Sequence, residues 1–99
     1  MKLVIVDEAR DDLARIGEQI ARNSPHRAAT FVDEIEAHCR QIAANPQAYP
    51  LLPGREATRL RRAVHGNYLI FYRIDPGGVL VIHILHGARD YEAILFPED

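Results

Sequence analysis

The sequence predicts one α+β domain, in which an N-terminal helical hairpin packs on a small antiparallel sheet in the order β-α-α-β-β-β. Apolar residues recur at the spacing of a helix between residues 7 and 45, which predicts two amphipathic helices. β-Branched and aromatic residues alternate between residues 59 and 86, and the turn sequence DPGG interrupts them. The 99 residues are enough for one modest core, so the single domain is expected to span residues 1–99.

The first 23 residues are expected to form a short strand followed by a helix. The run KLVIV is β-branched, which is typical of a strand, and Asp7 directly after it is a suitable N-cap. From there a stripe of apolar residues recurs at spacings of four, three and four until the helix ends near Asn23. The stripe consists of Ala9, Leu13, Ile16 and Ile20.

The triplet NSP, residues 23–25, predicts the end of one helix and the start of the next. Ser24 is a suitable N-cap, and Pro25 fits the first helical position because its missing N–H is not needed there. The second helix is expected to end at Asn45, and two helices joined so closely should form an antiparallel hairpin. Its apolar stripe contains Ala28, Phe31, Val32, Ile35, Cys39 and Ile42.

Three strands are expected after a crossing loop at residues 47–56. They are RLRRAV, NYLIFYRI and VLVIHILH, with tight turns at HG and DPGG between them. One face of the sheet should pack on the helical hairpin, and the other should be partly open to solvent or to a partner. Alternation in the middle strand separates Tyr68, Ile70, Tyr72 and Ile74 from Asn67, Leu69, Phe71 and Arg73.

Composition places the chain among ordinary soluble globular proteins. It is 47% hydrophobic and 26% charged, and no apolar run approaches the roughly 20 residues that span a bilayer. The N-terminal segment turns acidic too early for a signal peptide, so a cytoplasmic location is expected. The single cysteine, Cys39, offers no disulfide or zinc cluster, and its place on the apolar stripe predicts a core residue rather than a nucleophile.

The middle of the chain carries a local excess of positive charge, although the formal net charge is −2. Such a patch suits the phosphates of RNA or the carboxylates of a partner protein. The protein partner is favoured because the total charge is slightly negative and no phosphate-binding loop, zinc pattern or basic helix accompanies the patch. The patch sets Arg55, Arg59, Arg61, Arg62 and Arg73 against Glu56, and an acidic C-terminal segment that includes Glu98 and Asp99 follows it.

The stretch HILHGARD, residues 83–90, combines two histidines with an arginine and an aspartate. On a helix, His83 and His86 would share a face and could ligate one metal ion, but on a strand they point to opposite faces. The β-branched surroundings and the preceding turn predict a strand, so no metal site is expected. His83 is expected to be a half-buried sheet residue whose polar atoms are satisfied.

A catalytic interpretation of the same stretch depends on how the strands are arranged. If the three strands form a meander, His65, Tyr68 and His86 lie at one end of the sheet, with Arg89 just past it. A general base, a general acid and a cation gathered there could support metal-free cleavage of RNA. The plainer interpretation, which the residues favour, is that the His-Gly pairs close turns and that Arg89 and Asp90 cap or pair locally.

Three segments together, YPLLPG, LRRAVHGNYLIFYRID and ILHGARDYEAIL, resemble the ParE branch of the ParE/RelE superfamily of bacterial toxins. The resemblance extends from about Leu3 to Leu95. It implies a growth-arresting α+β toxin without a cofactor, encoded in a plasmid-stabilising module with a ParD-like antitoxin whose partly disordered segment wraps it. ParE-like members poison DNA gyrase, whereas RelE-like members cut messenger RNA on the ribosome, and the fold alone does not choose between them.

The resemblance also assigns expected roles to residues. The nuclease set is incomplete, because Leu69 stands where the middle strand would carry an arginine and no tyrosine follows Tyr91. We therefore expect a non-enzymatic gyrase inhibitor with no catalytic residue, which contacts its target through His86 and Arg89. The alternative is a ribosome-dependent mRNA interferase that uses His65, His86, Arg89 and Tyr91.

Two further expectations concern the antitoxin. A cationic and aromatic surface should bind its acidic, amphipathic segment, and the residues expected there are Arg59, Arg61, Arg62, Tyr68 and Arg73. A third interpretation of the chain is a decayed toxin that retains only antitoxin binding.

Overall fold

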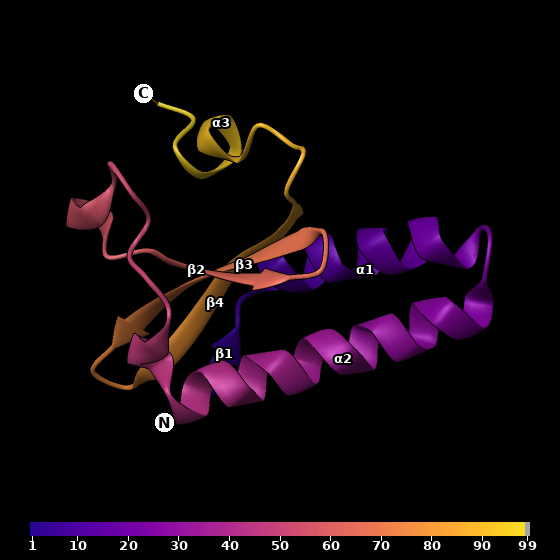
Figure 1. The fold of residues 1–99 in the computed structure, drawn as a ribbon, viewed down its shortest axis with the longest axis horizontal. Helices are drawn as coiled ribbons and strands as arrows, with labels where there is room; N and C mark the ends of the chain where they lie inside the picture. Colours follow the sequence, from indigo (N-terminus) through magenta and orange to yellow (C-terminus); the bar gives the residue numbers. More distant parts are fainter. Residues whose placement is uncertain (99) are drawn as a thin grey trace.

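The computed structural model describes residues 1–98 (Figure 1). Asp99, one of the acidic residues at the C-terminus, lies outside the described residues. The predicted order β-α-α-β-β-β is confirmed, and a short C-terminal helix that the sequence did not predict follows it. The elements are β1 (Leu3–Ile5), α1 (Asp7–Ala21), α2 (Pro25–Ala44), the 3₁₀ helices η1 (Pro46–Ala48) and η2 (Glu56–Thr58), β2 (Arg61–His65), β3 (Tyr68–Asp75), β4 (Gly78–His86) and α3 (Tyr91–Leu95).

The two long helices form the predicted antiparallel hairpin, which extends past the β2–β3 end of the sheet (Figure 1). Ser24 caps α2, since its side-chain oxygen accepts a hydrogen bond from the backbone N–H of Arg27 at 3.2 Å. The N-cap of α1 is Val6, so the prediction that Asp7 is the cap is wrong. Val6 is still extended and donates its N–H to the carbonyl of Val81, and the helix begins at the next residue.

The sheet has the strand order β1-β4-β3-β2. The consecutive strands β2, β3 and β4 are antiparallel, as predicted, and β1 adds to β4 in parallel. β1 has only three residues and pairs as far as Val81, so the rest of β4 lacks a strand partner on that side among the described residues. The register places His65 opposite Tyr68 and Tyr68 opposite His86, which aligns these three residues across one end of the sheet.

One strand begins later than predicted. β2 starts at Arg61, and Arg59 before it has a left-handed backbone with φ of 64° at the end of η2. The prediction that the whole run RLRRAV is a strand is therefore wrong at Arg59, which belongs to a turn. Leu60 between them is buried, so the chain turns here to place an apolar side chain in the core.

The sheet has an apolar core on each side. The helix side is the main core, where Ile70 and Tyr72 of β3 pack with the apolar stripes of α1 and α2. On the other side, Leu69 and Phe71 pack with a second apolar cluster. The expectation that this face of the sheet is partly open is therefore wrong at β3. This second cluster contains Leu52, Leu60 and Leu85, with Ile82, Tyr91, Ile94, Leu95 and Phe96 packed against it.

No helix among residues 1–98 is both long enough and apolar enough to cross a membrane.

Candidate functional site

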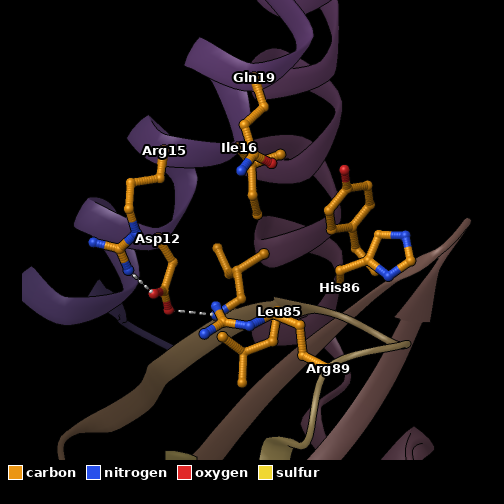
Figure 2. A pocket seen from close by; sticks show the side chains of 9 residues that line it. Asp12, Arg15, Ile16, Gln19, Leu85, His86 and Arg89 are labelled. Carbon is orange, nitrogen blue, oxygen red and sulfur yellow. Dashed lines mark hydrogen bonds and ion pairs between the residues drawn. The ribbon is translucent and has the colours of Figure 1, made fainter.

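A cavity of about 300 Å³ opens between α1 and the end of β4 that carries the His-Gly turn. Figure 2 shows side chains from α1 facing those at the end of β4 and in the turn after it. The lining combines charged, aromatic and aliphatic groups, so the cavity can contact a partner through both ionic and apolar interactions. It is lined by Asp12, Arg15, Ile16, Gln19, Tyr68, Ile84, Leu85, His86 and Arg89.

Asp12 organises one wall of this cavity from a buried position, with 3% of its surface exposed. One carboxylate oxygen pairs with the guanidinium of Arg15 at 2.6 Å. The other lies 2.7 Å from Nδ1 of His83 and accepts the backbone N–H of Ile84 at 3.0 Å. Because β1 ends before this point, the carboxylate takes the place of a strand partner for β4.

This geometry confirms that His83 is a half-buried sheet residue with a satisfied imidazole, as predicted. The sequence reasoning missed Asp12, although its spacing gave a signal. Asp12 lies three residues after Ala9 and four before Ile16, which places a carboxylate on the apolar stripe of α1. A buried charged residue needs hydrogen-bond partners, and Arg15, His83 and the backbone N–H of Ile84 provide them.

His86 and Arg89 share the cavity, as the turn at Gly87 predicts. The ring of His86 meets that of Tyr68 edge to face, with centroids 5.1 Å apart. Its Nδ1 accepts the backbone N–H of Ala88 at 3.0 Å, which leaves Nε2 as the ring nitrogen available to a partner. Arg89 is exposed, and its guanidinium makes no hydrogen bond or ion pair with the part of the chain that the structure describes.

His65 lies on the other side of Tyr68, in a second cavity of about 430 Å³ between α2 and the β2–β3 turn. Its Nδ1 is 2.9 Å from Nδ1 of His38 on α2, and its Nε2 is 3.9 Å from a carboxylate oxygen of Glu34. The predicted alignment of His65, Tyr68 and His86 is thus present. The imidazole of His65, however, is engaged by α2 and does not line the cavity of His86 and Arg89.

Tyr91 is separated from His86 and Arg89 by the sheet. Its ring lies 5.2 Å from that of Phe71 in the second apolar cluster. Its hydroxyl accepts a hydrogen bond from the guanidinium of Arg62 at 3.1 Å. The four residues of the nuclease alternative are therefore divided among three places, and only His86 and Arg89 share a cavity.

The arginines proposed for antitoxin binding are distributed over both sides of the sheet. Arg61 donates to the carbonyl of Tyr49 at 2.6 Å, and Arg62 donates to Tyr91 on the α3 side. Arg73 forms an ion pair with Asp75 at 3.1 Å, whereas Arg59 is exposed. Tyr68 is the first residue of β3 and lines both cavities.

Two further groups bear on the chemistry of the chain. Among residues 1–98, no cluster of three or more His, Cys, Asp or Glu side chains has the arrangement to hold a metal ion. Cys39 is fully buried, and this burial raises the pKa of its thiol to about 11. It is a core residue, as predicted, because a thiol that stays protonated at neutral pH is a poor nucleophile.

Two comparisons with known proteins, one of sequence and one of structure, each found a match. The sequence model of a family described as "ParE toxin of type II toxin-antitoxin system, parDE" matches residues 3–91. The solved toxin-antitoxin complex RelBE2 from Mycobacterium tuberculosis contains a similar chain, with 23% sequence identity and a TM-score of 0.55. That similarity covers 86% of this chain and 95% of the other, and at this identity it shows the fold alone. No curated protein matches the chain.

Proposed function

Because the chain belongs to the family of ParE toxins of type II toxin-antitoxin systems, we propose that it arrests growth by binding DNA gyrase and not by catalysis. The observation that supports binding is the separation of the four candidate catalytic side chains. His65 is engaged by His38, and Tyr91, the first residue of α3, packs against Phe71, so neither lines the cavity of His86 and Arg89. A surface that only binds needs no such convergence of acid, base and cation.

We propose His86 and Arg89 as contacts with the target. Both line the cavity at the end of β4, where Nε2 of His86 and the guanidinium of Arg89 are available as donors. Tyr68 adds an aromatic surface between them and α2. Aromatic and arginine side chains together are typical of the residues that dominate protein interfaces.

The experiment is a supercoiling assay with purified gyrase and purified toxin. The toxin should inhibit supercoiling or trap cleaved DNA with gyrase, and the double substitution of His86→Ala and Arg89→Ala should raise the required concentration roughly tenfold or more. The matched control is the double substitution of His26→Ala and Arg22→Ala, which removes the same two residue types from exposed positions and should leave inhibition unchanged. Normal supercoiling at saturating toxin would refute the proposal.

One observation favours a second candidate, a ribosome-dependent mRNA interferase. His86, Arg89 and Arg15 line one cavity, so an imidazole and two guanidinium groups could meet a phosphate there. In that case, toxin added to translating ribosomes would cause codon-dependent loss of messenger RNA, and His86→Ala would abolish it. Intact messenger RNA in the same assay would remove this candidate.

We also propose that a cognate ParD-like antitoxin binds and neutralises the chain, and that both act in the cytoplasm, where gyrase is found. The support is family membership together with the similar fold of the chain in the RelBE2 toxin-antitoxin complex. The exposed Arg59 gives this partner a positive contact for an acidic segment.

A further inference from the structure

A chain of polar contacts joins α2 to the loop after it and to the end of β2. His38, on α2, is at its centre. Its Nε2 is 3.0 Å from the hydroxyl of Tyr49, and its Nδ1 is 2.9 Å from Nδ1 of His65. At the far end, Nε2 of His65 is 3.9 Å from a carboxylate oxygen of Glu34. The imidazoles thus connect the loop, the helix and the edge strand next to the β2–β3 turn.

When both imidazoles are neutral, the donors and acceptors along this chain follow one direction. The carboxylate of Glu34 favours a proton on Nε2 of His65, which leaves the lone pair of His65 Nδ1 as an acceptor. Nδ1 of His38 then carries a proton and donates it to His65. Nε2 of His38 accepts from the hydroxyl of Tyr49, so every group has a partner.

One added proton is accommodated by reversing this direction. With both nitrogens of His65 protonated, Nδ1 of His65 donates to Nδ1 of His38, and Nε2 faces the carboxylate of Glu34. His38 moves its own proton to Nε2 and donates it to the hydroxyl oxygen of Tyr49. The contacts are kept, and the one positive charge lies beside a negative one.

A second added proton cannot be accommodated. Both Nδ1 atoms would then carry a proton, and two donors would face each other at 2.9 Å with two like charges. Among residues 1–98, the one carboxylate within 4 Å of either imidazole is that of Glu34, which also pairs with Arg27 at 3.0 Å. The charged and titratable groups around the pair are Arg27 and Glu34 on α2, Tyr49 in the loop, Arg61 of β2, which bonds to the carbonyl of Tyr49, and Tyr68 of β3.

We propose that the contact between His38 and His65 is an acid-sensitive latch, which holds the β2–β3 turn on α2 while the pair carries at most one extra proton and releases it when both imidazoles are charged. Contacts between aromatic rings would transmit the movement of the released turn to His86 in the proposed target-binding surface. His65 meets Phe31 with ring centroids 6.0 Å apart, and Phe31 meets Tyr68 at 4.9 Å. Tyr68 in turn meets His86, so movement of the turn alters the wall that both cavities share.

The environment of His38 agrees with this geometry. Burial and the neighbouring His65 lower the pKa of His38 from its ordinary value of 6.5. The unfolded chain therefore binds more protons at this residue than the folded chain does. The contribution of neutral His38 to the stability of the folded chain is therefore complete above a pH of about 6.5 and is lost as the pH falls through the lowered pKa.

The test is an NMR titration of the full chain that follows the imidazole nitrogens of each histidine from pH 8 to pH 4.5. His26 is exposed near the start of α2 and serves as the internal reference. His38 should become charged only below its ordinary pKa of 6.5. When His38 finally becomes charged, the amide signals of Gly66 and Asn67 in the turn should shift, whereas those of β1 should not.

A variant separates the latch from a general effect of acid. His65→Gln keeps a polar partner for His38 without a charge, so the midpoint of His38 should move upward and the late shift of the turn should disappear. His26→Gln is the matched control and should leave both unchanged. If His38 becomes charged at or above its ordinary pKa of 6.5, or if the turn does not respond when His38 becomes charged, the latch does not exist. The wild-type titration alone gives this decision if the His65 variant does not fold.

Discussion

At the scale of single residues, Asp12 shows how one carboxylate can complete a sheet. It is the buried charged side chain of the described residues, and it accepts from Arg15, His83 and the backbone N–H of Ile84. A buried charge is tolerated only when several donors replace water around it, and α1 delivers this one to the point where β1 stops.

We predict that Asp12→Ala lowers the free energy of unfolding by about 3 kcal/mol, because it leaves the N–H of Ile84 and the ring of His83 without an acceptor. Asp12→Asn keeps one acceptor oxygen and should cost about half as much. Urea unfolding followed by circular dichroism measures both changes. The neighbouring Asp11 is exposed, so Asp11→Ala is the control and should change stability by less than about 0.5 kcal/mol. An equal, small effect at both positions would contradict the role of Asp12.

Gly78 illustrates a second constraint at this scale. The sequence indicated a tight turn at DPGG, which the structure confirms between β3 and β4. Gly78 has φ of 147°, and a Cβ there would clash with the carbonyl oxygen of Lys2, which accepts the N–H of Val79. Gly77 has open space around it. The second glycine is therefore required by the entry of β1 beside β4 as well as by the turn.

At the scale of elements, α3 covers the face of the sheet that does not pack on α1 and α2. Tyr91, Ile94 and Leu95 are three and four residues apart, which places them on one side of a single helical turn over Phe71. Five residues are too few for periodicity to predict a helix, so the sequence left this face partly open. In the structure, α3 covers this face, and Tyr91 packs against Phe71.

We predict that Tyr91→Phe keeps growth arrest and lowers the free energy of unfolding by about 1 kcal/mol, because it removes only the hydrogen bond from Arg62. Tyr91→Ala also removes the ring from Phe71 and should cost about 3 kcal/mol. Growth after induction and thermal unfolding measure the two effects. A catalytic Tyr91 would give the opposite pattern, in which Tyr91→Phe abolishes growth arrest and leaves stability almost unchanged.

Local chemistry made most of the elements predictable. Ser24 and Pro25 mark the start of α2, and DPGG marks the β3–β4 turn, because capping and turn geometry depend on neighbouring residues alone. The parallel pairing of β1 with β4 joins residues more than 70 positions apart, so no local pattern reports it. The register shift between Phe71 and Tyr72 and the turn at Arg59 depend on the packing of the whole sheet in the same way.

The candidate site was predictable to the same degree. The register of a simple meander brought His65, Tyr68 and His86 into line, and the turn at Gly87 placed Arg89 beside them. The spacing marks Asp12 as unusual, but the sheet residues that Asp12 and His38 contact were not predictable, because both meet the sheet only after the hairpin has packed on it.

At the scale of the whole molecule, the basic segment in the sequence does not become one basic face. Arg61 supports the loop at Tyr49, Arg62 supports α3 and Arg73 pairs with Asp75, so these arginines have structural tasks besides any partner. Arg59 is exposed in its left-handed turn and is the clearest test of the proposed antitoxin surface.

We predict that Arg59→Glu weakens the complex with the antitoxin roughly tenfold, and more strongly at low salt, because it places a negative charge opposite an acidic segment. Arg40→Glu makes the same change of charge at an exposed position on α2 and is the control. Calorimetric titration at two salt concentrations measures both. An unchanged affinity for Arg59→Glu, or an equal loss for Arg40→Glu, would place the interface elsewhere.

The short length of β1 also bears on aggregation. A strand edge with free N–H and C=O groups is a template on which another chain can add. At β4 this template is blocked, because α1 turns back along the edge and Asp12 engages the N–H of Ile84. At β2, Pro50 and Leu51 cover only the first residues, and Val64 beyond them is 61% exposed. Addition of a strand from another chain is therefore expected to begin at the edge of β2 and not at the part of β4 that β1 leaves without a strand partner.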